Sequence, residues 1–463
     1  MRSELWNPGM RRHDSIWRRL SPPQLFVGSF LLLIVLGVAA LQGLPGVYAG
    51  ERLSLLDALF TVTSAVCVTG LIVVDTATFF TPFGQGVILV LIQLGGLGII
   101  AFTTVVLVAL GRRLSLRHEQ LAAGTLDVAP QVDYRQLVRS VIVFTVLIEL
   151  VGGALLFLFW LPEMGAVDAW WPALFHSVSA FCNAGFSVFS DSLVGYQQAP
   201  FTQGVIMSLI VVGGIGFLTL EELMLYRKSG RRFRMTLHSR MVLTMTGLLI
   251  GGGWVFFTLF EWDNTLTDLP AWARVLNGLF ISVTARTAGF NTIDYAQASD
   301  STNFLTMILM SIGGSPGSTA GGLKTTTVAL IALQAWSRLR GREVVSIWDR
   351  SIPPETTQRA VGLFALSAVI ITATIFVFTS TETTDARLHQ GFLHYAFETV
   401  SAFNTVGLSM GVTDDLTVTG RLTIITLMFV GRVGLLTVAA SLARRALEPV
   451  GGFRYAYEEV LVG

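Results

Sequence analysis

The sequence predicts an all-α membrane protein with eight transmembrane helices, arranged as four span–pore-helix–span repeats around a pseudo-four-fold pore. Three observations predict this fold: a low charge content, apolar runs of spanning length, and one motif that occurs four times. Charged residues make up 13% of the 463 residues and apolar residues 52%, whereas globular domains usually contain ~25% charged residues. This composition excludes a disordered chain, a nucleic-acid-binding protein and an ordinary cytosolic enzyme.

Eight apolar runs approach the ~20 residues needed to cross the hydrocarbon core of a bilayer. They lie at 24–46, 84–111, 137–161, 204–226, 241–261, 303–337, 360–380 and 419–443. Four shorter apolar stretches lie between successive pairs of these runs, at 54–67, 171–183, 273–286 and 392–404. Stretches of this length cannot cross the membrane, so we expect them to be re-entrant half-helices.

The basic residues predict the orientation. Of the 31 Lys and Arg residues, 24 fall in the two terminal tails and in segments 111–140, 227–240 and 338–359, and four fall in the opposite loops. Cytoplasmic loops carry the excess of Lys and Arg, so we expect a multi-pass protein of the plasma (inner) membrane with both termini in the cytoplasm. The chain then divides into a cytoplasmic N-terminal tail (1–23), four pore repeats (24–111, 112–226, 227–338 and 339–447) and a cytoplasmic C-terminal tail (448–463).

A glycine-centred motif follows each predicted half-helix. The four copies are Val68-Thr69-Gly70, Asn183-Ala184-Gly185, Thr287-Ala288-Gly289 and Thr405-Val406-Gly407. A single copy would be an ordinary loop glycine, but four copies with matching flanks indicate four units of one topology about an axis along the membrane normal. Non-helical backbone inside a membrane is tolerated only where protein buries it or where it lines a water-filled cavity. We therefore expect the four motifs to meet on the axis.

Four such segments have the chemistry of a potassium filter. Rings of backbone carbonyl oxygens can replace the hydration shell of K⁺, and glycine supplies the dihedral φ > 0 that aims successive carbonyls the same way. The C-terminal ends of the half-helices carry partial negative charge, which favours a cation between them. The twelve motif residues are the predicted K⁺ site, and K⁺ is the expected transported ion.

The predicted closing spans carry clusters of small residues at similar distances past the filter glycines. They are Gly95-Gly96-Leu97-Gly98, Gly213-Gly214-Ile215-Gly216, Gly313-Gly314-Ser315-Pro316-Gly317 and Gly431-Arg432-Val433-Gly434. Close helix packing accounts for the first two clusters. The third continues through Ser318, Thr319, Ala320, Gly321 and Gly322, and cannot stay helical through so much Gly, Ser and Pro. We expect it to break its span beneath the filter, at the inner cavity.

Two basic residues accompany this predicted break. Arg432 replaces the second glycine of the fourth cluster, and a charge at mid-span indicates a functional site. We expect it to hold the Ser315–Thr319 stretch by hydrogen bonds and to raise the barrier to cations in the closed pore; an ion pair with Glu149 is the alternative. Lys324 follows the loop and either reaches polar partners or extends to the cytoplasmic interface.

The filter motifs with their flanks, Ser64–Leu71, Ser179–Phe186, Thr284–Phe290 and Ser401–Leu408, resemble those of the Trk/Ktr/HKT superfamily of potassium transporters. The resemblance extends from about residue 24 to the C-terminus, and with four units alone the chain is most similar to the Ktr membrane subunit (KtrB-like). In that superfamily a serine at the first filter glycine accompanies sodium permeation; glycine at all four positions here implies potassium selectivity. The resemblance also implies a gate in the third unit, a membrane homodimer, and a cytoplasmic KtrA-like ring of nucleotide-binding regulatory subunits.

Other functions fit the sequence less well. An alternating-access secondary transporter coupling K⁺ to Na⁺ or H⁺ also uses broken helices, but the repeats here are not inverted; sodium as an activator or co-ion stays open. Residues 313–317 fit the G-x-S-x-G string of serine hydrolases, but no strand precedes them. We therefore expect no enzyme activity, no nucleotide site in this chain and no nucleic-acid partner.

Overall fold

The computed structural model describes residues 22–109, 134–229, 234–382, 391–435 and 437–438. Almost all of the predicted N-terminal tail, most of the basic segment 111–140 and the whole predicted C-terminal tail lie outside these ranges. The described residues form helices with one minute hairpin, β1 (Ser346–Ile347) and β2 (Arg350–Ser351).

The helices follow the order that the repeats predict. The first repeat contains α1 (Pro22–Gly43), α2 (Leu55–Val66), α3 (Thr76–Phe79) and α4 (Pro82–Ala109), and the second contains α6 (Tyr134–Cys182), the short η2 (Val194–Tyr196), α7 (Pro200–Ile215) and α8 (Phe217–Ser229). The third contains α9 (Leu237–Glu261), α10 (Ala271–Thr284), α11 (Asp300–Ser311) and α12 (Thr325–Leu339), and the fourth α13 (Pro354–Thr381), α14 (Phe392–Phe403) and α15 (Val418–Val433).

The four predicted half-helices are present. Three are α2, α10 and α14, and the remaining one is the end of α6, which follows a break at Gly165 with φ 79° and ψ 166°. Ser54 caps α2 by accepting a hydrogen bond from the backbone N–H of Asp57, as N-cap serines do. No more than two residues separate the end of each half-helix from its filter motif.

The described helices do not confirm all eight predicted spans. Four described helices, α1, α6, α9 and α13, are long and apolar enough to cross a membrane, and a fifth span is formed if α7 and α8 count as one, whereas eight were predicted. The predicted span 204–226 bends by 104° between α7 and α8, where Gly216 adopts φ 92°. The predicted span 419–443 is interrupted at Gly434, and 303–337 is broken between α11 and α12, as expected. Glycine clusters therefore interrupt the closing segments of the second, third and fourth repeats, whereas α4 of the first repeat continues through its cluster as one helix of 28 residues.

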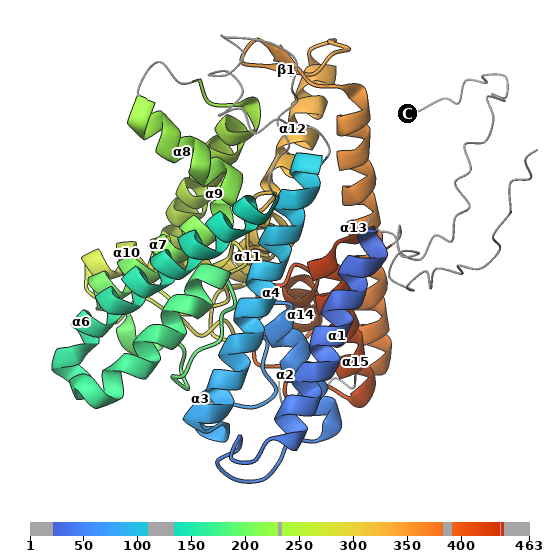
Figure 1. Cartoon of the computed structure of the whole chain (residues 1–463). Helices are drawn as coiled ribbons and strands as arrows, with labels where there is room; N and C mark the ends of the chain where they lie inside the picture. The colour runs from blue at the N-terminus through green and yellow to red at the C-terminus, as the bar shows by residue number, and fades with distance from the viewer. Residues whose placement is uncertain (1–21, 110–133, 230–233, 383–390, 436, 439–463) are drawn as a thin grey trace, which may run out of the picture.

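The repeats contact one another in cyclic order. The helix α4 packs against α6, α7 against α10, and α11 against α14, and α15 of the last repeat packs against α2 of the first. In Figure 1 the hairpin at β1 and the helix α8 lie at one end of the molecule and α3 lies at the other. The basic segments 227–240 and 338–359 are thus brought to the same end.

Candidate functional site

The structure brings the four filter motifs together in a closed ring. Each motif glycine faces the backbone of the next motif so closely that a Cβ atom would not fit. A Cβ atom on Gly70 would lie 2.4 Å from the carbonyl oxygen of Ala184 in the second motif, and one on Gly185 would lie 2.8 Å from Cα of Gly289 in the third. A Cβ atom on Gly289 would lie 2.5 Å from the carbonyl oxygen of Val406 in the fourth motif, and one on Gly407 would lie 2.1 Å from the carbonyl oxygen of Thr69 in the first. The ring therefore closes from the fourth motif back to the first.

Each motif contains two residues in the left-handed region of backbone space. The glycines have φ between 69° and 98°, as predicted, and the residue two positions earlier has φ between 51° and 68°. These earlier residues are Val68, Asn183, Thr287 and Thr405. The sequence did not predict them, because a left-handed non-glycine residue costs ~1–3 kcal/mol and persists only where its surroundings hold it.

Hydrogen bonds from the half-helices hold these strained segments. The backbone N–H of Thr69 donates to the carbonyl of Ser64 at 2.8 Å, and Val406 donates to Ser401 in the same way at 2.9 Å. The hydroxyl oxygens of these two serines accept the N–H groups of Gly70 and Gly407, each at 3.1 Å. In the first and fourth motifs these N–H groups are therefore directed back onto their own half-helices.

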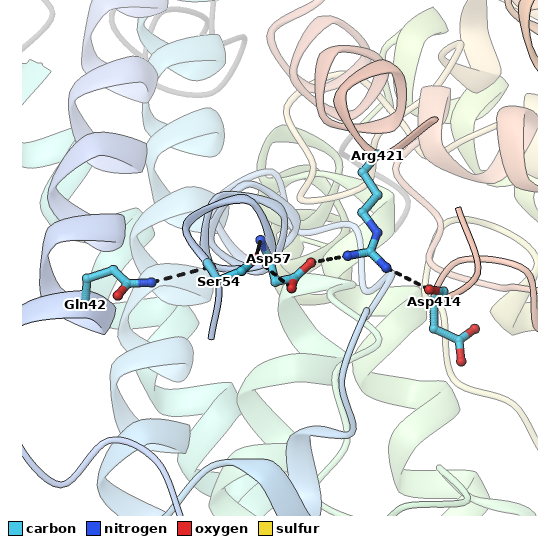
Figure 2. Close-up of polar contacts among 5 residues, drawn as sticks. All are labelled: Gln42, Ser54, Asp57, Asp414 and Arg421. Atoms are coloured by element: carbon cyan, nitrogen blue, oxygen red, sulfur yellow. Dashed lines mark hydrogen bonds and ion pairs between the residues drawn. The ribbon is translucent and has the colours of Figure 1, made fainter. Parts of the chain in front are cut away.

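An ion pair joins the first and last repeats near the predicted external ends of their helices (Figure 2). Arg421, in the first turn of α15, pairs through Nη1 with Asp57 of α2, and its Nη2 donates to the carbonyl of Asp414 at 2.8 Å. Asp57 also accepts the hydroxyl of Ser54 at 2.7 Å, and Gln42 of α1 donates to the carbonyl of Ser54 at 3.4 Å. The seam, meaning the contact between two neighbouring repeats, lies here between the first and fourth repeats, which no loop of the chain connects directly. The Arg421–Asp57 ion pair bridges it.

Polar side chains at the matching place close two other seams. Gln85, in the first turn of α4, accepts a hydrogen bond from the indole N–H of Trp171 in the second repeat at 2.6 Å. Gln203 of α7 donates to the amide oxygen of Asn277 in the third repeat at 3.3 Å. These contacts were missed from sequence. The signal that could have found them is a polar residue in the first turn of each closing helix.

The small-residue clusters let the closing helices approach the half-helices. A Cβ atom on Gly95 would lie 2.0 Å from the carbonyl oxygen of Val66, and one on Gly213 would lie 2.0 Å from that of Phe181. The same atom on Gly431 would lie 1.8 Å from the carbonyl oxygen of Phe403. The close packing predicted for the first two clusters is confirmed.

The broken segment of the third repeat is packed under the ring. Its backbone N–H groups at Ser315 and Thr319 donate to the carbonyls of Gly214 and Gly213, at 3.0 and 3.2 Å. The Thr319 hydroxyl donates to the carbonyl of Phe181 at 3.0 Å. On the other side, a Cβ atom on Gly321 would lie 1.9 Å from Oγ1 of Thr405 in the fourth motif. The loop therefore contacts the second and fourth repeats and is almost wholly buried.

The two basic residues both donate to this loop. Arg432 is 2% exposed; it hydrogen-bonds through Nη1 to the carbonyl of Thr319 and through Nη2 to that of Gly95 at 3.4 Å. The alternative pair does not form, because the Glu149 carboxylate accepts from Gln93 at 2.9 Å and the described ion pairs do not include it. Lys324 donates to the carbonyl of Ala320 at 2.7 Å, and so reaches a polar partner.

The chain has extensive similarity to known proteins. Residues 27–449 match the family described as TrkH, Cation transport protein. The potassium/sodium uptake protein NtpJ of Enterococcus hirae is 38% identical over 96% of this chain and 98% of its own length. The Ktr system potassium uptake protein B of Bacillus subtilis is also 38% identical, over 96% of this chain and 98% of its own. The crystal structure of the potassium transporter TrkH from Vibrio parahaemolyticus has a TM-score of 0.74 at 19% identity, covering 94% of this chain and 87% of that chain, which shows a shared fold.

Proposed function

Because the chain belongs to the TrkH family of cation transport proteins, we propose that it is the potassium-selective membrane subunit of a K⁺ uptake system. The family consists of cation transporters and not of enzymes, and the chain is a multi-pass membrane protein. The proposal deepens this identity in four respects: the ion, the filter, the gate and the partners.

The closed ring of four glycine motifs carries the proposal. The backbone N–H groups of residues 68–70, 183–184, 288 and 405–407 bond to the half-helices. The groups proposed to face an ion on the axis are the carbonyl oxygens of residues 68–70, 183–185, 287–289 and 405–407. Such oxygens replace the hydration shell of K⁺. The half-helices end at the same ring and add their partial negative charge. The names of the relatives, potassium/sodium uptake and potassium uptake, agree with K⁺ as the ion.

The loop from Gly313 to Gly322 is the proposed gate. It is buried directly below the ring and bonded to the second and fourth repeats, so an ion leaving the filter meets it. Arg432 places a positive charge at the same level, which opposes cations while its bond to Thr319 is intact. Opening requires the loop to leave these bonds.

The membrane arrangement belongs to the same proposal. In this proposal four repeats, with two membrane-crossing segments each, surround the axis; the closing segments of the second, third and fourth repeats are broken or bent, and α4 is continuous. The end of the molecule with β1 and α8 is placed in the cytoplasm with both termini, since the basic residues gather there. A membrane homodimer and a KtrA-like nucleotide-binding ring on this face are the proposed partners; the Ktr system names of the relatives imply a multi-component assembly.

An alternating-access transporter that couples K⁺ to Na⁺ or H⁺ is the second candidate. The broken third repeat and the potassium/sodium name of one relative favour it. Ordinary enzyme-like turnover lies below roughly 10³ per second, so single-channel current steps from the purified protein in bilayers would support the filter and gate. Slow, saturating uptake that depends on a Na⁺ or H⁺ gradient would support coupling instead.

The direct test is ion-replacement uptake in cells that lack their own potassium systems. Growth at low K⁺ and K⁺ uptake that depends on this chain are expected, with Na⁺ and Li⁺ transported poorly. Expression with and without the genes beside its own tests the partner. Uptake that responds fully to nucleotide when the chain is purified alone would exclude the regulatory ring.

A further inference from the structure

A second buried arginine contacts the proposed gate. Arg286 follows the half-helix α10 and is 7% exposed. Its Nη2 donates to the carbonyl of Gly313, the first residue of the loop, at 3.2 Å. The contact differs from that of Arg432, which bonds to Thr319 farther along the loop.

The position of Arg286 within its repeat makes its size and charge unusual. Counted from the filter glycine, three residues back, the other repeats carry Cys67, Cys182 and Asn404. These residues face the layer below the ring: Cys182 packs against Gly96, and Asn404 packs against Gly322 of the loop. A small neutral side chain therefore suffices at this position for packing under the filter.

Within the described part of the chain, no carboxylate forms an ion pair with the Arg286 guanidinium. The ion pairs of Arg274 with Asp263 and of Arg421 with Asp57 do not involve Arg286, and Nε of Arg286 has no hydrogen-bond partner among the described residues. The side chain borders a cavity of about 20 Å³, shared with Thr246, Gly214 and Gly314. A buried guanidinium without an anion is costly unless carbonyl oxygens accept from it, and the structure provides one such oxygen, on the loop.

We propose that Arg286 is a positioning residue of the gate, which stabilises the closed loop by bonding its first residue while Arg432 bonds its middle. Departure of the loop would leave the Arg286 cation without its acceptor, so the side chain favours the closed state. This inference rests on the proposed gate, and extends it from one arginine to two that bind different residues of the loop, Gly313 and Thr319.

The test measures basal K⁺ flux and the K⁺/Na⁺ flux ratio in proteoliposomes. Arg286→Cys introduces the residue that two other repeats carry here, and should raise basal flux about tenfold, equivalent to about 1.4 kcal/mol in the closing equilibrium, with the flux ratio unchanged. Arg286→Lys keeps a positive charge and a hydrogen-bond donor but loses the planar, multi-donor guanidinium group, so basal flux should rise less. This variant also tests the inference if the cysteine variant fails to insert into the membrane. Arg274→Gln, in the helix α10 that precedes Arg286 but bonded to the carbonyls of Leu269 and Thr267, is the matched control and should leave flux unchanged.

The deletion of residues 313–322 separates this inference from the proposed function. In that background Arg286→Cys should have no further effect, because the residue acts through the loop. An added rise there, or a changed flux ratio with unchanged basal flux in the intact protein, would overturn the inference and place Arg286 in the filter support. If the deletion alone leaves basal flux unchanged, the proposed gate itself is wrong.

Discussion

Replacing Gly70 with serine tests the filter most directly. Gly70 has φ 98°, and a Cβ atom on it would lie 2.4 Å from the carbonyl oxygen of Ala184, where real Cβ contacts stay above 3.0 Å. That oxygen must therefore retreat by at least the 0.6 Å difference, or the first motif must move away from the axis. Either movement widens one quarter of the carbonyl ring.

The expected loss of K⁺/Na⁺ discrimination follows from the backbone strain that serine would have at position 70. A non-glycine residue in this region costs ~1–3 kcal/mol, and if most of that energy is relieved by displacing the carbonyls, discrimination between ions falls by a similar amount. About 1.4 kcal/mol corresponds to a tenfold change, so the K⁺/Na⁺ flux ratio of Gly70→Ser should fall about tenfold. Competitive uptake of K⁺ and Na⁺ into proteoliposomes measures it.

Gly411 offers a matched control for backbone strain. It also has a left-handed φ, 83°, and lies four residues beyond the fourth motif, but no heavy atom lies within 4 Å of its Cβ position. Gly411→Ser should therefore keep the flux ratio of the parent. An unchanged ratio in Gly70→Ser, or an equal loss in Gly411→Ser, would refute the reasoning that the ring contact sets selectivity.

Three further predictions concern the gate and the packing of the repeats. Deletion of residues 313–322, or Arg432→Ala, should raise basal K⁺ flux, because each removes an obstruction or a charge below the ring; lower conduction in both variants would exclude the obstruction model. Asp57→Asn and Arg421→Gln should each lower thermal stability, and a double-mutant cycle should give a coupling of about 1 kcal/mol for this partly exposed pair; additive effects would show that the pair does not hold the seam. Gly431→Ala should destabilise the protein by about 1–3 kcal/mol through overpacking against Phe403, whereas Gly362→Ala, with no neighbour within 4 Å, should not; equal melting temperatures for the two variants would contradict this.

Several features of the site were open to prediction because their signal is local. The four motifs repeat a short string in register, and a loop such as Gly313–Gly322 has too much Gly, Ser and Pro to remain helical. Arg432 stood out because a charge replaced glycine within a repeated cluster. In each case the residue type alone restricts the backbone or the solvation, so that the sequence carries the argument.

Other features depend on contacts between distant segments. The bend at Gly216 was not predicted, because the same glycine in a closing helix fits either close packing or a break; there Phe217 donates to the carbonyl of Gly317 in the loop. The left-handed backbone at Val68 was not predicted either, because its strain is tolerated only within the surrounding ring. Such breaks interrupt three of the eight predicted spans, those of the second, third and fourth closing segments.

The sequence by itself determined that one motif recurs four times, that its glycines need a left-handed backbone, and where the third closing segment breaks, because repetition and backbone preference are properties of short segments. Only the tertiary structure decided which backbone each glycine faces, that Arg421 and Asp57 close the last seam, and that Arg286 reaches the first residue of the loop. These are pairings between residues 27 to 364 positions apart. Their partners are chosen by packing, which no single segment specifies.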